Sequence, residues 1–249
     1  MASELEAPQS ATGAPALEAR GIVREYGPVT AVAGIDLSLE PGEFLTVFGP
    51  NGAGKSSLLG LLAGALRPTR GDVSVNGTRL DFGEVDWRRH IGVLSHQGFL
   101  YPQLTAEENL AFYGRLHGLA DLGRRIPERL AHVGLADRAS SLVGHLSHGM
   151  RQRLALARAL FHDPDVILLD EPYTGLDPSA AAVLRGVLTE LKDGRRTVVM
   201  VTHNLSEGFA LASRVAIQVR GRFAWQGSAD QLDVPDFERL YHQVVEGRA

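Results

Sequence analysis

The sequence of 249 residues contains no cysteine. This absence excludes disulfide bonds, thiolate metal sites and a cysteine nucleophile, and it suits a reducing compartment. No apolar run approaches the ~18 residues that a membrane-spanning helix needs, and residues 1–19 do not show a basic region followed by an apolar one. We therefore expect a cytoplasmic protein whose contact with a membrane depends on a partner.

The sequence also lacks a block of lysine and arginine. With 25 basic and 29 acidic residues, the formal net charge is −4, so a nucleic-acid backbone is not an obvious electrostatic partner. The length suits one α/β domain with a subdomain. Residues 1–16, rich in alanine, serine, proline and glutamate, are predicted to form a disordered tail, and residues 17–249 to form the domain.

One glycine-rich stretch organises the rest of the chain. It follows the apolar run at 44–48, precedes the helical run at 57–63 and reads Gly49-Pro50-Asn51-Gly52-Ala53-Gly54-Lys55-Ser56-Ser57. It matches the pattern G-x-x-x-x-G-K-[ST], in which backbone N–H groups cradle phosphates at the start of a helix. Lys55 is predicted to reach the outer phosphates and Ser56 to hold Mg²⁺. These residues, called the phosphate loop below, predict a nucleotide site.

The remaining pattern alternates strands with helices. Short apolar runs separated by turns predict strands within residues 17–48, and helical patterns follow over 104–162, with a capping box from Thr105 to Glu108 and pieces at 129–133 and 149–161. Strands at 166–169 and 197–201 then flank a helix at 179–192, and a last helix is expected at 237–245. We predict an α/β fold: a P-loop NTPase core with a parallel sheet, an N-terminal antiparallel β subdomain and an inserted helical subdomain at about 104–162.

Two acidic residues end the apolar strand at 166–169. Asp170 at the carboxyl end of a buried parallel strand would lie beside the phosphate loop, where it can orient Mg²⁺ through its waters. Glu171 would polarise the attacking water. Two solvated acids at the end of a strand are the alternative, and the separation from Lys55 does not decide between them.

A second motif supplies the context for these acids. Leu146-Ser147-His148-Gly149-Met150 starts a helical run that continues to Leu160. The serine can cap that helix or hold a phosphate at its amino end. With the other motifs in this order, the chain resembles the ATP-binding-cassette (ABC) ATPases, whose signature most commonly reads Leu-Ser-Gly-Gly-Gln. His148 and Met150 depart from that form, and His148 near a phosphate would make activity pH-dependent.

The resemblance implies further roles for single residues. Tyr26 would stack on adenine, and Gln97 would contact Mg²⁺ and the attacking water, with Gln103 as the weaker candidate. His203 would contact the γ-phosphate. A partly buried turn tyrosine and a simple loop amide are the alternatives for Tyr26 and Gln97.

The resemblance also implies that two subunits share the chemistry. Ser147 and Gly149 would bind the γ-phosphate of the ATP held by the other subunit, and Asp177 would lie in a loop that communicates across this dimer. As an aspartate before a proline, Asp177 could equally cap the next helix. The implied ligands are ATP and Mg²⁺.

We expect this ATPase to be a subunit of a transporter. Membrane-spanning subunits on separate chains would dock at a groove beside residues 98–102, at the cytoplasmic face of the inner membrane. Residues 91–113 and 146–160 most resemble the ATP-binding subunit of the haem exporter of cytochrome c biogenesis, although exporters of lipids, polysaccharides or drugs have similar sequences. A soluble ABC ATPase acting on DNA or ribosomes is the alternative, which the single cassette and the lack of a basic arm disfavour.

Overall fold

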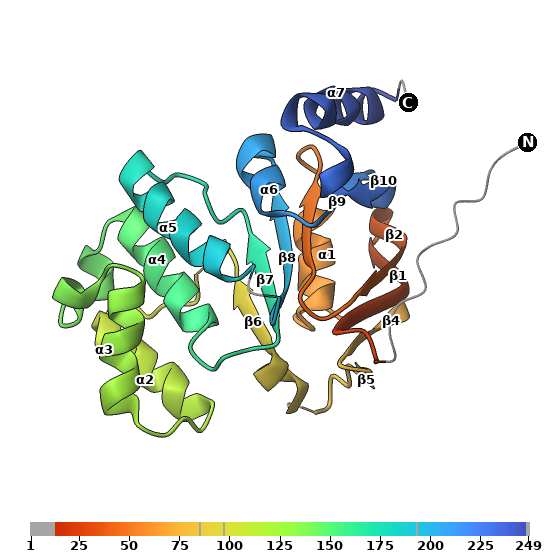
Figure 1. Ribbon diagram of the computed structural model, residues 1–249. Coiled ribbons are helices and arrows are strands. Elements are labelled where there is room, and N and C mark those ends of the chain that lie inside the picture. The colour runs from red at the N-terminus through yellow and green to blue at the C-terminus, as the bar shows by residue number, and fades with distance from the viewer. Residues whose placement is uncertain (1–12, 85, 97, 193, 248–249) are drawn as a thin grey trace, which may run out of the picture.

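The computed structural model describes residues 13–84, 86–96, 98–192 and 194–247 (Figure 1). A four-stranded sheet has the strand order β2-β1-β4-β5, and a six-stranded sheet has the order β10-β9-β3-β8-β7-β6. The strands are β1 (Leu17–Tyr26), β2 (Val29–Leu39), β3 (Phe44–Phe48), β4 (Arg70–Val75), β5 (Thr78–Arg79), β6 (Ile91–Leu94), β7 (Val166–Asp170), β8 (Thr197–Thr202), β9 (Arg214–Val219) and β10 (Arg222–Ser228).

The directions of the strands confirm the predicted fold class. All pairs in the smaller sheet are antiparallel, whereas β3, β6, β7, β8 and β9 run parallel in the larger sheet and only β10 is antiparallel to its neighbour. Of the predicted tail, residues 1–12 lie outside the described residues. Ala16 is buried, and its backbone N–H donates to the carbonyl of Leu39 over 2.9 Å.

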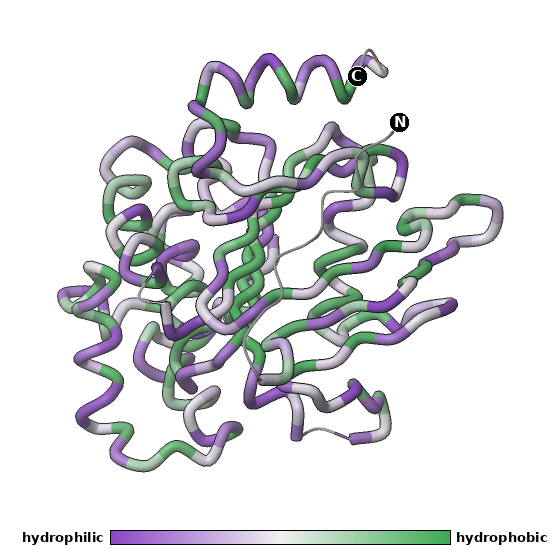
Figure 2. Tube along the Cα trace, turned by 45° about the vertical axis from the view of Figure 1, so that its right-hand side comes forward, coloured by the Kyte–Doolittle hydropathy of each residue, from purple (hydrophilic) through white to green (hydrophobic). Residues whose placement is uncertain are grey.

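Strands β7 and β8 are buried on both faces. One face packs on α4 (His148–Ala159) and α5 (Pro178–Glu190), and the other packs on α1 (Lys55–Leu62). Alternate residues therefore enter different cores, with Leu169 and Met200 on the first side and Leu168 and Val201 on the second. Because both faces need apolar side chains, these strands are continuous hydrophobic runs, as the hydrophobic centre in Figure 2 shows.

The helical block contains α2 (Ala106–Leu116), α3 (Leu122–His132) and α4. The predicted capping box is present: the hydroxyl of Thr105 accepts from the Glu108 N–H over 3.2 Å, and the Glu108 carboxylate accepts from the Thr105 N–H over 2.8 Å. The sequence predicted a helical piece at 129–133. The observed helix α3 is longer: it starts at Leu122, contains Pro127 in its interior and ends at His132, one residue earlier than predicted. A proline there forgoes one backbone hydrogen bond, which the packing of Leu130 in the core offsets.

The end of the chain packs against the strand that enters the phosphate loop. On α7 (Val234–Val245), the ring of Phe237 lies 4.8 Å from the ring of Phe48 at the end of β3 and 4.9 Å from that of Phe209 on α6 (Leu205–Leu211). The sequence did not predict α6, a short helix with Gly208 in its middle, where a Cβ would meet Phe48 at 2.7 Å. None of the helices in the described ranges is long and apolar enough to cross a lipid bilayer.

Candidate functional site

The phosphate loop connects β3 to α1, as the sequence predicted. Gly52 and Gly54 have φ angles of +78° and +98°, which side chains other than glycine rarely adopt. A Cβ on Gly54 would also lie 2.0 Å from the carbonyl oxygen of Ala31 on β2. These glycines let the backbone curl around the amino end of α1, where free N–H groups and the helix dipole favour an anion.

Lys55 directs its amino group into this loop. The side chain is buried, and Nζ donates to the carbonyls of Gly49 at 2.7 Å and Pro50 at 3.1 Å. Burial lowers the pKa of Lys55, while the nearby carboxylates of Glu171 and Asp170 raise it. A buried ammonium held by two carbonyls gains from a phosphate that brings full negative charge to the same place.

Ser56 and Asp170 meet across the sheet from different parts of the sequence. The Ser56 hydroxyl lies 3.4 Å from Oδ1 of Asp170, which ends β7. Burial raises the pKa of the Asp170 carboxyl, and the hydrogen bond from Ser56 opposes this shift. A hydroxyl and a carboxylate beside the phosphate loop are the oxygen ligands that Mg²⁺ prefers, so the residues present fit the ion.

Glu171 and His203 form a contact that the sequence did not predict. Nδ1 of His203 lies 2.9 Å from Oε2 of Glu171, and the same oxygen accepts from the hydroxyl of Thr202 at 3.1 Å and from the His203 N–H at 3.3 Å. Glu171 has a φ of +48°, a costly conformation for a residue with a side chain. The backbone turn at the end of β7 thus points its carboxylate toward the end of β8.

The signature residues lie at the start of α4. The Ser147 hydroxyl accepts from the Met150 N–H at 3.2 Å, so the serine caps the helix. A Cβ on Gly149 would lie 2.9 Å from Cβ of Ala180, so the glycine allows α4 and α5 to approach closely. His148 Nε2 lies 3.1 Å from the Thr174 carbonyl and links α4 to the loop before α5.

The structure describes three of the remaining four candidate site residues. Tyr26 ends β1 with 42% of its surface exposed, and the guanidinium of Arg24 lies 4.6 Å from the centre of its ring. The Asp177 side chain accepts from the Ala180 N–H at 2.9 Å and caps α5, the alternative that its position before proline allowed. Gln97 lies outside the described residues, and Gln103 is exposed.

Two residues near the site were missed by sequence reasoning. The Thr202 hydroxyl donates to the Glu171 carboxylate, as described above. In the sequence, only its position just before His203 indicates this role. Gln218 on β9 is fully buried, and neither of its amide atoms has a hydrogen-bond partner among the described residues. A Cβ on Gly54 would lie 3.0 Å from its Nε2, so Gln218 supports the back of the phosphate loop. In the sequence, the indication of this role is that Gln218 is a single amide within an apolar strand.

A groove of about 900 Å³ separates the helical block from the core. Trp87, Phe99, Tyr113 and Leu116 line it, and the exposed fractions of Phe99 and Leu116 are 49% and 69%. The sequence predicted a docking groove beside residues 98–102, and of these residues Phe99 lines the groove described here. Its floor holds Arg158, whose guanidinium lies 5.5 Å from the ring centre of Phe99 and 5.2 Å from that of Tyr113.

Two histidines stack at one end of this groove. The rings of His117 and His162 are 3.9 Å apart and nearly parallel. Nε2 of His162 lies 3.2 Å from the carbonyl of Ile91 and therefore carries the proton, whereas Nδ1 has no partner in the described part of the chain. Burial, followed by the nearby His117, lowers the pKa of His162 to about 4.

This lowered pKa makes the folded protein sensitive to acid. Between about pH 6.5 and pH 4 the unfolded chain binds a proton at His162 that the folded protein does not bind. The contribution to stability is therefore complete above pH 6.5 and is lost as the pH falls toward 4, by about 2–3 kcal/mol. In urea unfolding at several pH values, His162→Phe should flatten this part of the stability curve, while the exposed His242→Phe should not. Equal curves for the wild type and His162→Phe would contradict this.

Comparisons with known proteins agree with the geometry. A family model described as ABC transporter matches residues 32–174. The chain is 37% identical to the ABC transporter ATP-binding protein NatA of Bacillus subtilis over 82% of this chain and 84% of that protein. It is also 37% identical to the spermidine/putrescine import ATP-binding protein PotA of Pseudomonas aeruginosa, over 89% of this chain and 60% of that protein.

Solved structures give the same result. An ATP-binding subunit of an ABC transporter superposes with a TM-score of 0.83 at 29% identity, covering 92% of this chain and 98% of that one. A dimeric ATP-binding cassette in a post-hydrolysis state, bound to ADP and phosphate, gives a TM-score of 0.75 at 28% identity, covering 86% and 98%.

Proposed function

Because the chain belongs to the ABC transporter family as an ATP-binding subunit that hydrolyses ATP with Mg²⁺, we propose that it powers export through separate membrane-spanning subunits. The observation that carries the ATP-hydrolysing part of the proposal is the clustering of Lys55, Asp170, Glu171 and His203 at the carboxyl ends of β3, β7 and β8. Parallel strands bring ligand-binding residues together at that edge of a sheet.

We assign the binding steps as follows. The backbone of residues 49–57 holds the phosphates, and Lys55 turns from the carbonyls of Gly49 and Pro50 to the outer phosphate oxygens. The ring of Tyr26 supports adenine, a contact worth ~1–3 kcal/mol. Ser56, Asp170 and Gln97 would hold Mg²⁺, which would neutralise negative charge on the phosphates.

We assign the hydrolytic step to Glu171 and His203. The Glu171 carboxylate, fixed by the hydroxyl of Thr202 and by His203, accepts a proton from the attacking water. His203 is 62% exposed on its side chain, so its ring can turn to the γ-phosphate when ATP binds. The proposed mechanism needs one carboxylate for Mg²⁺ and one to accept the proton, and the adjacent residues Asp170 and Glu171 provide them.

The proposal includes a dimer in which each nucleotide is shared. No hydrogen bond or ion pair between described residues joins the Ser147 segment to the phosphate loop of the same chain, and α4 and α1 lie on opposite sides of the sheet in Figure 1. A head-to-tail pair brings Ser147 and Gly149 of one protomer to the γ-phosphate held by the other. Closing on ATP and reopening after hydrolysis then yields a rigid-body motion.

The groove lined by Phe99 and Leu116 is the proposed docking site for the membrane-spanning partner, at the cytoplasmic face of the cell membrane. Exposed aromatic and aliphatic side chains suit a helix from such a partner. Export follows from the sequence resemblance, with haem for cytochrome c biogenesis as the proposed cargo. The relatives include both importers, such as PotA, and the Nod factor export protein of Ralstonia nicotianae.

A pull-down tests the proposal. Tagged Glu171→Gln protein, extracted from its native cells in mild detergent with Mg-ATP, should bring down a polytopic membrane protein. Haem-handling proteins in the same sample would support the proposed cargo. Ribosomes or DNA-repair factors without a membrane protein would instead show that a soluble machine uses the ATPase.

A second variant tests the docking groove itself. Leu116→Glu places a charge on the most exposed large apolar side chain of the groove and should abolish recovery of the membrane partner. ATP hydrolysis by the isolated subunit should stay within about twofold of the wild type, since Leu116 does not touch the nucleotide site. Leu142→Glu is the matched control, because Leu142 is also exposed but lies outside the groove. Equal recovery with both variants would refute the docking site.

A further inference from the structure

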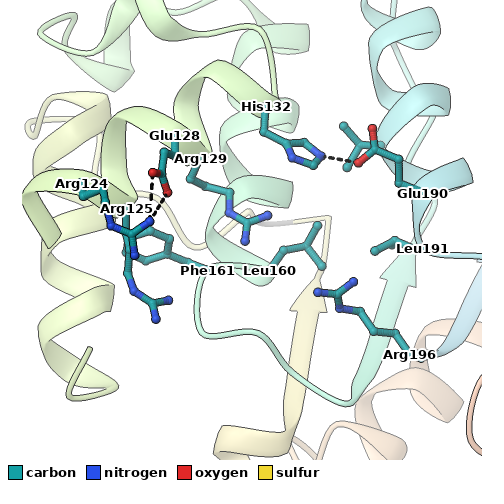
Figure 3. A pocket seen from close by; sticks show the side chains of 11 residues that line it. Arg124, Arg125, Glu128, Arg129, His132, Leu160, Phe161, Glu190, Leu191 and Arg196 are labelled. Atoms are coloured by element: carbon teal, nitrogen blue, oxygen red, sulfur yellow. Dashed lines mark hydrogen bonds and ion pairs between the residues drawn. The ribbon is translucent and has the colours of Figure 1, made fainter. Parts of the chain in front are cut away.

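A second pocket, of about 410 Å³, lies on the flank of the helical block, between α3, the end of α4, and α5 (Figure 3). Its floor is apolar and includes Leu160, Phe161 and Leu191. Its walls are basic, with three arginines from α3 and Arg196 from the segment that leads into β8. The volume falls within the range of small-ligand sites, and the assigned nucleotide machinery contributes none of its lining.

The carboxylates near the pocket are already engaged. Arg124 pairs with Glu128 at 3.0 Å, and His132 pairs with Glu190 at 3.0 Å, as the dashed lines in Figure 3 show. Arg196 pairs with Asp163, just outside the pocket. Each of these carboxylates therefore already has a direct side-chain partner.

Arg125 and Arg129 are the two arginines left without such a partner. Within the described ranges, neither guanidinium makes a hydrogen bond or an ion pair, and both side chains are partly buried. Burial is the largest cause that lowers the pKa of Arg129, followed by the positive charge of Arg196; Asp163 opposes this shift, and Arg125 and Glu190 have smaller effects in opposite directions. Crowded cations in a partly desolvated pocket are unfavourable unless an anion joins them.

We propose that this pocket binds a phosphate group, carried either by a soluble phosphorylated compound or by an anionic lipid headgroup. Each guanidinium offers a planar pair of N–H donors that matches two phosphate oxygens. Two guanidiniums without a direct partner match the charge of a phosphate dianion. The apolar floor accommodates the organic part of the ligand, so a phosphate ester fits the whole pocket better than the bare ion.

Binding of inorganic phosphate tests the site. The phosphate loop is first saturated with Mg²⁺ and a non-hydrolysable ATP analogue, so that it cannot take up the probe. Equilibrium dialysis with labelled phosphate should then show binding to the wild type that weakens about tenfold or more in Arg129→Gln and in Arg125→Gln. Arg115→Gln, an exposed arginine of α2 in the same helical block, is the matched control and should bind within about twofold of the wild type.

A second arm identifies the source of the phosphate. Cosedimentation with vesicles of phosphatidylcholine and phosphatidylglycerol in equal parts, compared with pure phosphatidylcholine, reports on lipid headgroups. Sedimentation that depends on Arg129 and on the anionic lipid assigns a headgroup, whereas arginine-dependent phosphate binding without it assigns a soluble ligand. The proposal is wrong if neither probe binds, or if both arginine variants bind like the wild type.

The variants themselves are not expected to unfold. Burial of the Arg129 guanidinium disfavours its charged form more than any neighbouring charge does, so the thermal midpoint of Arg129→Gln should equal or exceed that of the wild type. ATP hydrolysis should also persist in Arg129→Gln. Loss of phosphate binding with both properties retained therefore reports on the pocket alone.

Discussion

Glu171→Gln is expected to lower ATP turnover by about 10²- to 10⁴-fold. The amide keeps the shape of the side chain and can still accept from the hydroxyl of Thr202, but it cannot take a proton from water. Nucleotide affinity should change little, because the phosphate loop is untouched. In the presence of Mg-ATP the closed dimer should accumulate, which size-exclusion chromatography detects. Phosphate release assays measure the turnover.

Glu43→Gln is the matched control for this change. The Glu43 side chain is 26% exposed and pairs with Arg214, while Glu171 is 22% exposed and pairs with His203. Glu43 lies just before β3, at the opposite end of the sheet from the phosphate loop. Its variant should hydrolyse ATP within about twofold of the wild-type rate. Wild-type turnover in Glu171→Gln would show that another group accepts the proton.

Lys55→Met is expected to weaken ATP binding by about 2–5 kcal/mol, at least thirtyfold, because it removes a buried charge that pairs with the phosphates. The nucleotide-free protein should keep or raise its thermal midpoint, since burial of the Lys55 ammonium disfavours its charged form. Fluorescent nucleotide titration measures the affinity, and calorimetry measures the midpoint.

The chain offers a direct control, because its sequence contains only one other lysine, Lys192. Nζ of Lys192 donates to the carbonyl of Ala210 at 3.3 Å and takes no part in the nucleotide site. Lys192→Met should bind ATP as the wild type does. Tight binding by Lys55→Met would mean that backbone N–H groups alone account for the affinity.

The sequence could predict the elements whose signal is local. The phosphate loop, the capping box at Thr105 and the doubly buried strands β7 and β8 each carry their pattern in consecutive residues, and the structure confirms them. The fold class follows from these elements, because parallel strands alternating with helices leave few arrangements. Helix α6 was missed because seven residues around Gly208 carry too little helical periodicity.

The contacts between distant segments could not be predicted in the same way. The bond between Glu171 and His203 depends on the positive φ of Glu171 and on the order of β7 and β8 in the sheet, which no local pattern encodes. The pocket of Arg125 and Arg129 likewise needs the packing of α3 against the end of α4. From the sequence of α3 alone, Arg125 and Arg129 would be interpreted as part of a solvent-exposed helix face.

The strand order also limits when the ATPase can first exist during synthesis. Strand β8 lies between β3 and β7, so a ribosome must complete residues 197–202 before Lys55 can be aligned with Asp170 and Glu171. Until then the nascent chain presents two unjoined hydrophobic strands, the kind of edge that recruits foreign strands. Pausing before residue 197 would therefore favour aggregation more than pausing after β8 is complete, when only the edge of β3 that pairs with β9 is still open.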